Sequence, residues 1–192
     1  MPDPASTAPV TVRALTGNAE IDGVVALSER LRRGRHDAED EARDGFVTIA
    51  YDAPTVAALA ATAPQIVAVD ASGAVVGYAL ALVPAAQAAV PELAGMFDLL
   101  GRIEVGGAPL AGQRYTVMGQ VAIDPAHRGT GLFDRLYAAY RAHLSADFDL
   151  CVTEIAARNG RSRAAHARVG FEDVHVYDDL GESWHVVVWR WR

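Results

Sequence analysis

Apolar positions in the first part of the chain follow two spacings, one typical of strands and one typical of helices. They predict strands at 10–15, 65–71 and 74–83 and helices at 21–33 and 54–63. Ser72 and Gly73 separate the last two strands as a hairpin turn does. The charged segment 37–44 gives no clear pattern, and the segment 45–50 is compatible with an extended conformation.

The segment 84–113 is less regular and contains three prolines and several glycines. We expect an irregular connection with a short helix, because four apolar residues share one helical face. These residues are Leu93, Met96, Phe97 and Leu100. We interpret the face as a packing surface, with a lid or a homodimer contact as the alternative.

Strands and helices alternate in the remainder of the chain. The pattern predicts strands at 114–123, 150–155, 172–177 and 184–191, a helix at 159–169, and a helix marked by Leu132, Leu136, Tyr140 and Leu144. Helices interspersed among mainly antiparallel strands indicate an α/β (α+β) fold. With 192 residues we expect a single domain, 10–192, that follows a flexible N-terminal tail, 1–9.

The junction between the strand that ends at Ile123 and the helix after it is the most informative segment. Its turn carries Arg128, Gly129 and Gly131. The first N–H groups of a helix have no partner within it, and the helix dipole adds positive charge there, so such ends bind anions. Glycine lets an anion approach the backbone, and a guanidinium suits phosphate oxygens. The junction therefore predicts a phosphate-binding site.

Two common phosphate-binding motifs do not fit this junction. A P-loop has Lys and then Ser or Thr after its last glycine, whereas Leu132 and Phe133 follow Gly131 here. A dinucleotide fingerprint has a third glycine where this chain has Asp134. A nucleoside triphosphatase and a Rossmann domain are both disfavoured.

The junction resembles the acetyl-coenzyme A loop of the Gcn5-related N-acetyltransferases (GNAT superfamily). That loop has the signature Gln or Arg, any two residues, Gly, any one residue, then Gly or Ala. Arg128 and Gly131 match it, and Phe133 stands at its last position.

A second segment is similar to another cofactor motif of the same superfamily. In that motif an Asn opens a helix, and a Tyr that faces the thioester sulfur commonly precedes a Gly-Phe pair by four residues. Asn159, Ser162 and Gly170-Phe171 match the pattern, with His166 at the Tyr position. The two motifs stand in the expected order, and the resemblance covers about a hundred residues, 65–171.

The resemblance implies a fold and a reaction. The fold is a GNAT-like mixed, mainly antiparallel sheet of six to seven strands, flanked by about four helices and splayed between the fourth and fifth strands. The reaction is direct transfer of an acyl group from acetyl-coenzyme A to a primary amine of a small molecule or peptide. The pantetheine arm runs between the splayed strands, and the amine enters from the opposite side. The implied cofactor-binding residues are Val121, Ile123, Arg128, Gly129, Thr130, Gly131, Leu132, Phe133, Asn159 and Ser162.

His166 and Glu154 are the candidate catalytic residues. Acyl transfer to an amine requires a base for the amine, donors for the oxyanion and a proton for the thiolate. His166 is the candidate proton donor, because an imidazole has an ordinary pKa of about 6.5 and a phenol one of about 10. The alternative is that His166 only hydrogen-bonds to a backbone carbonyl or to the cofactor. Asn159 is equally well explained as a helix cap.

Glu154 is the preferred base because its strand lies beside the implied cofactor. Glu104, Tyr115, Gln120 or a chain of water molecules are the alternatives for this role. We expect the side chains that recognise the acceptor to come from 33–46 and 84–112, which carry no readable motif.

Charge and composition limit the partners. The 17 basic and 24 acidic side chains give a net charge of −7, which argues against nucleic acid and is compatible with a cationic amine. We interpret the basic cluster 30–35 as a solvated helix end, with a nucleic-acid patch as the less favoured alternative. The histidines show no ligand spacing, so we predict no metal.

The sequence also limits the compartment. No apolar run approaches the roughly 20 residues that cross a bilayer, and the first ten residues lack the features of a signal peptide. The single cysteine, Cys151, excludes an internal disulfide and agrees with a reducing compartment. We therefore expect a cytoplasmic protein that has no membrane partner.

Two other functions stay open. The first is a non-catalytic module that binds or senses acyl-coenzyme A, which Phe133 and the missing Tyr at position 166 favour. The second is a nucleotide-binding domain that uses the same helix end for another phosphate ligand.

Overall fold

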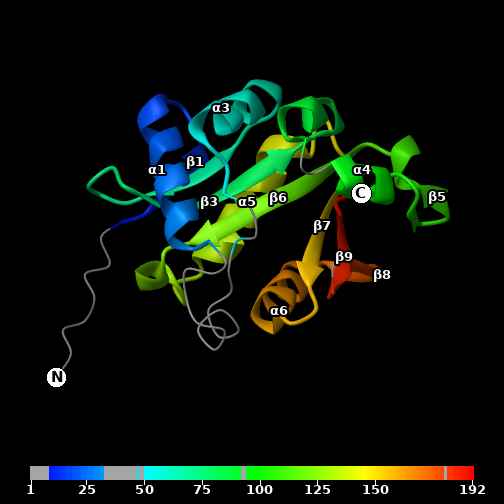
Figure 1. The fold of residues 1–192 in the computed structure, drawn as a ribbon. Coiled ribbons are helices and arrows are strands. Elements are labelled where there is room, and N and C mark those ends of the chain that lie inside the picture. Colours follow the sequence, from blue (N-terminus) through cyan, green and yellow to red (C-terminus); the bar gives the residue numbers. More distant parts are fainter. Residues whose placement is uncertain (1–8, 33–46, 48–49, 92–93, 180) are drawn as a thin grey trace.

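The computed structural model describes residues 9–32, 47, 50–91, 94–179 and 181–192. Their dominant feature is a seven-stranded sheet in the order β1-β2-β3-β6-β7-β9-β8 (Figure 1). The strands of the sheet are β1 (Thr11–Ala14), β2 (Ile66–Val69), β3 (Val75–Leu82), β6 (Tyr115–Ile123), β7 (Leu150–Ala156), β8 (Glu172–Asp179) and β9 (Glu182–Arg190). A separate hairpin pairs β4 (Glu104–Val105) with β5 (Ala108–Pro109).

Five α-helices and three 3₁₀ helices complete the described part of the chain. They are α1 (Asn18–Arg30), α3 (Ala53–Thr62), α4 (Ala94–Leu100), α5 (Leu132–Leu144), α6 (Gly160–Val169), η1 (Pro84–Ala89), η3 (Leu110–Gly112) and η4 (Pro125–His127). Neighbouring strands of the large sheet pair antiparallel, except β6 and β7, which pair parallel. The predicted mixed, mainly antiparallel sheet is confirmed.

The helices cover both faces of the sheet. Gly77 and Tyr78 are neighbours on β3, so they point to opposite faces. A Cβ atom on Gly77 would lie 3.4 Å from Leu136 of α5. The Tyr78 hydroxyl donates to the Oε1 atom of Gln120, which also accepts from Ser28 of α1. Hence α5 covers one face, and α1 and α3, which contact each other, cover the other (Figure 1).

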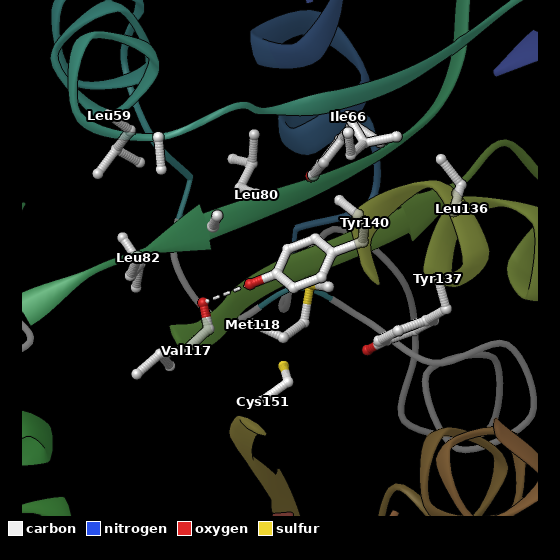
Figure 2. Packing of buried hydrophobic residues seen from close by; sticks show 14 of the residues in the cluster. Leu59, Ile66, Leu80, Leu82, Val117, Met118, Leu136, Tyr137, Tyr140 and Cys151 are labelled. Atoms are coloured by element: carbon white, nitrogen blue, oxygen red, sulfur yellow. Dashed lines mark hydrogen bonds between the residues drawn. The ribbon is translucent and has the colours of Figure 1, made fainter. Parts of the chain in front are cut away.

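Tyrosines of α5 reach deep into the core. Figure 2 shows Tyr137 and Tyr140 among aliphatic side chains of β3 and β6. The Tyr140 hydroxyl donates to the Val117 carbonyl at 3.2 Å and shares a hydrogen bond of 2.9 Å with the Thr116 hydroxyl. The buried Tyr140 hydroxyl is therefore hydrogen-bonded, as buried polar groups usually are. Cys151 is fully buried beside them, and burial raises the pKa of its thiol to about 12, which agrees with a packing role.

Capping residues fix the helices and turns near the predicted motifs. Asp52 accepts a hydrogen bond from the Thr55 N–H group at the start of α3. The Asp70 carboxylate accepts hydrogen bonds from the N–H groups of Ser72 and Ala74 in the hairpin turn between β2 and β3. At α6, the Asn159 Oδ1 atom accepts from the Ser162 N–H group at 3.1 Å. Asn159 is thus a helix cap, as one of the two interpretations of this residue expects.

The observed elements follow the predicted ones with small shifts. The first helix begins at Asn18 and ends at Arg30, whereas the sequence pattern placed it at 21–33. Its first turn is polar, and Glu20 accepts a hydrogen bond from the Thr16 N–H group, so the apolar pattern misses this start. The short helix expected within 84–113 is α4, and its Phe97 and Leu100 are buried as predicted. The described part of the chain has five α-helices where about four were expected.

Some predictions lie wholly or largely outside the described residues. They concern the tail at 1–9, the charged segment 37–44, the extended segment 45–50 and part of the basic cluster 30–35. Of these segments, Val47 pairs with Arg32 in an isolated parallel bridge. Arg30 is exposed at the end of α1, and its guanidinium lies 2.8 Å from the Asp124 carboxylate.

Candidate active site

The two central strands of the sheet separate along their length. β6 and β7 pair only between Tyr115–Val117 and Leu150–Val152. The Thr153 hydroxyl then donates to the Met118 carbonyl at 2.8 Å, at the point where the ladder stops. From there β6 continues beside β3 and β7 continues beside β9, and the two diverge in Figure 1. The predicted splay between the fourth and fifth strands is confirmed.

Backbone groups of β6 face this opening. The Asp124 N–H group donates to the Val76 carbonyl of β3. Since successive residues of a strand direct their backbone groups to alternate edges, Val121 and Ile123 direct theirs toward the splay. The pairing with β3 also shifts by one residue at Gly119, which forms a bulge.

Two cavities open at the splay and share part of their lining. The first, called the loop cavity, has a volume of about 590 Å³ and lies against the turn between β6 and α5. The second, called the hairpin cavity, has a volume of about 740 Å³ and lies against β7, α4 and the β8–β9 hairpin. The residues that line both are Val47, Val121, Asn159 and Ser162.

The loop cavity collects most of the predicted cofactor-binding residues. Those that line it are Val121, Ile123, Arg128, Gly129, Gly131, Leu132, Phe133, Asn159 and Ser162. Thr130 does not line it, and its hydroxyl donates to the His127 carbonyl at 2.8 Å. Gly129 and Gly131 have φ angles of 76° and 77°, a conformation that favours glycine. A Cβ atom at either position would meet no protein atom within 4 Å, so the space above the turn is open.

Positive charge surrounds the loop cavity. The Arg128 Nε atom donates to the Ile123 carbonyl at 3.1 Å, so this side chain also braces the turn against the end of β6. Arg161 and Arg168 line the cavity from α6, and Arg168 forms an ion pair of 3.0 Å with Asp134. The two α6 arginines were not predicted. Their spacing of seven residues places them on one helical face, which the sequence could have shown.

His166 is buried at the junction of α5 and α6. Its Nδ1 atom lies 2.8 Å from the Ser162 carbonyl, and its Nε2 atom lies 2.6 Å from the Tyr137 hydroxyl. A carbonyl oxygen only accepts, so Nδ1 carries the hydrogen and Nε2 accepts from Tyr137. Burial lowers the pKa of the imidazole to about 4, so the ring is neutral at pH 7. Both nitrogens are thus engaged, which supports the alternative of a hydrogen bond to a backbone carbonyl; the catalytic role stays a prediction.

Phe133 packs beside His166. The centroids of the two rings lie 5.3 Å apart in an edge-to-face arrangement, and the Phe133 and Tyr137 rings are 4.9 Å apart. The residue at the unusual motif position thus contributes to an aromatic cluster between α5 and α6.

Glu154 lines the hairpin cavity from the splayed part of β7. Burial raises the pKa of its carboxyl to about 7, although a hydrogen bond with Tyr177 opposes the shift. Its Oε1 atom is buried and has no hydrogen-bond partner among the described residues. Burial, together with the charge of Glu154, raises the pKa of the Tyr177 hydroxyl above its ordinary value, so this hydroxyl stays protonated and donates to the carboxylate. Glu154 is therefore a carboxyl group that exchanges a proton near neutrality at the cavity wall.

The alternative bases differ in their positions. Gln120 lines the hairpin cavity, but its Oε1 atom accepts hydrogen bonds from Ser28 and Tyr78. Glu104 lies on the β4–β5 hairpin, and Tyr115 lies at the closed end of the splay; neither lines the two cavities.

The β8–β9 hairpin contributes side chains that sequence reasoning missed. Tyr177, Asp178, Asp179 and Trp184 line the hairpin cavity. The sequence pattern indicated only two strands and a turn here, and no motif pointed to a site. Of the segment 84–112, Met96 and Leu99 of α4 line the hairpin cavity, and their part in acceptor recognition stays a prediction. The other predicted segment, 33–46, lies outside the described residues.

Neither a membrane span nor a metal cluster emerges from the described ranges. Over these residues, every helix is too short or too polar to cross a bilayer. Within the same residues, no three His, Cys, Asp or Glu side chains are grouped as metal ligands. The prediction of no metal stays a prediction.

No family model and no curated protein matches this sequence. Solved structures do match. A GNAT superfamily phosphinothricin acetyltransferase from Sinorhizobium meliloti, in complex with acetyl-coenzyme A, has a TM-score of 0.62 at 18% identity; the match covers 94% of this chain and 88% of that one. The ribosomal-protein-S18-alanine N-acetyltransferase from Escherichia coli has a TM-score of 0.61 at 12% identity, over 94% and 93% of the two chains.

Arabidopsis thaliana NAA60, in complex with acetyl-coenzyme A, has a TM-score of 0.59 at 13% identity, over 94% of this chain and 99% of that one. All three likenesses extend over nearly the whole of both chains, and they agree with the splayed seven-stranded sheet. They confirm the resemblance drawn from the two motifs at the level of architecture. The chain has the fold of the Gcn5-related N-acetyltransferases.

Proposed function

We propose that this protein is an acetyl-coenzyme A-dependent N-acetyltransferase of the GNAT superfamily that acts on a primary amine of a small molecule or peptide. The observation that carries the proposal is Glu154, a residue of the hairpin cavity wall whose carboxyl has a pKa of about 7 and a buried Oε1 atom with no hydrogen-bond partner among the described residues. That cavity meets the loop cavity at the strand splay. A base poised near the working pH is what removal of a proton from an ammonium group requires.

The residues of the loop cavity fit the coenzyme. The open turn at Gly129 and Gly131, with the first N–H groups of α5, suits a diphosphate. The arginines around the cavity supply the positive charge. The backbone groups of Val121 and Ile123 face the splay, where they would align the pantetheine arm. Bound acetyl-coenzyme A supplies the thioester that the amine attacks.

Residues of the chain would deprotonate the amine, stabilise the oxyanion and position the reacting groups. Glu154 accepts the proton of the acceptor ammonium, which leaves a neutral amine as nucleophile. As the new C–N bond forms and the C–S bond breaks, the attacking nitrogen would lose one further proton, and this proton would complete the departing thiol. Backbone N–H groups of β6 near the Gly119 bulge stabilise the developing oxyanion, because the extra residue of a bulge lies outside the ladder. His166, with both ring nitrogens engaged, fixes the first turn of α6 and so acts as a positioning residue.

A non-catalytic module that binds acyl-coenzyme A is the second candidate. It is favoured by His166, whose ring nitrogens are both engaged and which stands where the superfamily commonly has a Tyr. Both functions use the loop cavity to bind the coenzyme. They differ only in whether an amine in the hairpin cavity is acetylated.

The test is release of free thiol from acetyl-coenzyme A in the presence of a pooled amine library, with coenzyme binding measured by calorimetry on the same sample. We expect binding, and thiol release that depends on an added amine. Binding with no release over the whole library would contradict catalysis and support the second candidate. No binding of the coenzyme would contradict both functions.

A further inference from the structure

We propose that the acceptor is a small dication, in which a second cationic group besides the reacting amine binds the carboxylate of Asp179 in the hairpin cavity. The inference rests on the proposed function, since it assigns this cavity to the acceptor. It goes further because it names the charge that the acceptor carries away from the reacting atom. An α,ω-diamine is the simplest molecule of this class.

Acidic residues dominate the charged lining of the hairpin cavity. Its acidic residues are Glu154, Asp178, Asp179 and Glu182. Among the described residues, its basic group is His166, which burial keeps neutral at pH 7. Arg158 forms an ion pair of 2.6 Å with Glu182, so that carboxylate is balanced by a cation. The carboxyl groups of Glu154 and Asp179 make a wall that would repel an anionic acceptor.

These carboxylates lie at different places along the cavity. Asp178 and Asp179 end β8, and the register places Asp179 opposite Glu182 at the tip of the hairpin. Asp178 accepts a hydrogen bond from the Ser183 hydroxyl opposite it, so its side chain lies on the other face of the hairpin from Tyr177 and Asp179. Asp179 is exposed, whereas the Oε1 atom of Glu154 is buried. The cavity therefore runs from one solvated carboxylate, Asp179, to one carboxyl that exchanges a proton, Glu154.

Aromatic and thioether side chains also line the hairpin cavity. Tyr177 and Trp184 face each other in the β8–β9 register, and both line the cavity together with Met96 of α4. Aromatic and thioether surfaces suit methylene groups, and aromatic rings also attract cations. The charge of Asp179 contributes to the raised pKa of Glu154, so the two carboxyl groups are close enough to interact. One ligand with a short apolar spacer can thus contact both.

The experiment compares three acceptors that share one spacer and differ only in the distal group. They are 1,5-diaminopentane, hexylamine and 6-aminohexanoate, whose distal groups are cationic, neutral and anionic. We expect the lowest KM for the diamine, a KM about tenfold higher for hexylamine, and a still higher KM for the amino acid. The preference for the diamine should weaken as salt is added.

Two variants attribute the preference to the hairpin. Asp179→Asn should abolish the difference in KM between the diamine and hexylamine. Asp22→Asn removes a carboxylate from an exposed position of α1 that lines neither cavity, and it should leave this difference in place. A preference for the diamine that survives in Asp179→Asn would overturn the assignment to this aspartate.

A binding measurement separates the inference from the proposed function. Calorimetry with the coenzyme A-saturated protein reports acceptor affinity whether or not thiol is released. Preferential binding of the diamine without turnover would support the dication site and contradict the acetyltransferase. Equal or tighter binding of hexylamine or 6-aminohexanoate would overturn the dication site, whatever the turnover.

Discussion

The two cavities that meet at the splay are built in different ways. The loop cavity is formed largely by one continuous turn and the start of α6, and arginines dominate its charged lining. The hairpin cavity takes its walls from β7, α4 and the β8–β9 hairpin, which are far apart in the sequence, and carboxylates dominate its charged lining. Backbone geometry suits the first cavity to an anion, whereas side chains assembled by the fold suit the second to a cation.

This difference indicates that coenzyme binding depends on one cavity, and catalysis and acceptor choice on the other. Substitutions in the loop cavity should weaken coenzyme binding and spare the rate of the bound complex. Substitutions in the hairpin cavity should affect the rate and the choice of acceptor and spare coenzyme binding. The predictions below test this division, beginning with the largest expected effect.

Replacement of the candidate base should have the largest effect. We expect Glu154→Gln to lower kcat by roughly 100-fold or more, because the amide cannot accept the ammonium proton. The Kd for acetyl-coenzyme A should be unchanged. The control is Glu104→Gln, which removes a carboxylate that lines neither cavity. If Glu104→Gln were the inactive variant and Glu154→Gln the active one, the division would be wrong.

Replacement of Arg128 should have a smaller effect, and it should change coenzyme binding and not the rate. We expect Arg128→Ala to raise the Kd for acetyl-coenzyme A about tenfold, the order expected for one charge-assisted phosphate contact. At saturating coenzyme, kcat should stay within about twofold of the original value. Arg102→Ala, at an exposed position away from both cavities, is the control for the loss of one positive charge. A fall in kcat at unchanged Kd would contradict the assignment of the loop cavity to coenzyme binding.

The smallest effect on turnover is expected at His166. His166→Phe removes the partner of the buried Tyr137 hydroxyl, which should lower the free energy of unfolding by about 1–3 kcal/mol. Turnover should stay within about threefold. A loss of turnover of about 100-fold or more with coenzyme binding retained would instead identify His166 as the proton donor.

The pH dependence of stability gives His166 a second readout. Its pKa is lowered to about 4 in the folded protein, so the unfolded chain binds more protons between that pH and about 6.5. The contribution of this residue to stability is therefore present above about 6.5 and is lost as the pH falls toward 4. Chemical denaturation across this range should show that slope in the original protein and a weaker one in His166→Phe.

The sequence predicts the loop cavity well because its signals are local. Gly131 must adopt a positive φ, and Asn159 caps the helix that follows it by one residue, so each leaves a signature in adjacent residues. The apolar pattern of β6 likewise marks Val121 and Ile123. The first helix shows the limit of such signals, since its start depends on Glu20 and the Thr16 backbone rather than on apolar spacing.

The hairpin cavity could not be predicted to the same extent because its contacts are distant in the sequence. Glu154 and Tyr177 meet only after β9 has paired with both of their strands. The raised pKa of Glu154 arises from burial in the assembled fold, which no motif encodes. His166 was identified by its position in the motif, but its partner Tyr137 lies on another helix. Its neutral state results from burial in the assembled fold, which the sequence does not show.

The pH dependence of kcat in the original protein and in Glu154→Gln tests the central claim most directly. A carboxylate that accepts the amine proton works only when ionised, and the pKa of Glu154 is about 7. The account therefore predicts that kcat rises with pH through a midpoint near 7, and that this limb is absent in the variant. The same limb in Glu154→Gln, at an undiminished rate, would contradict it.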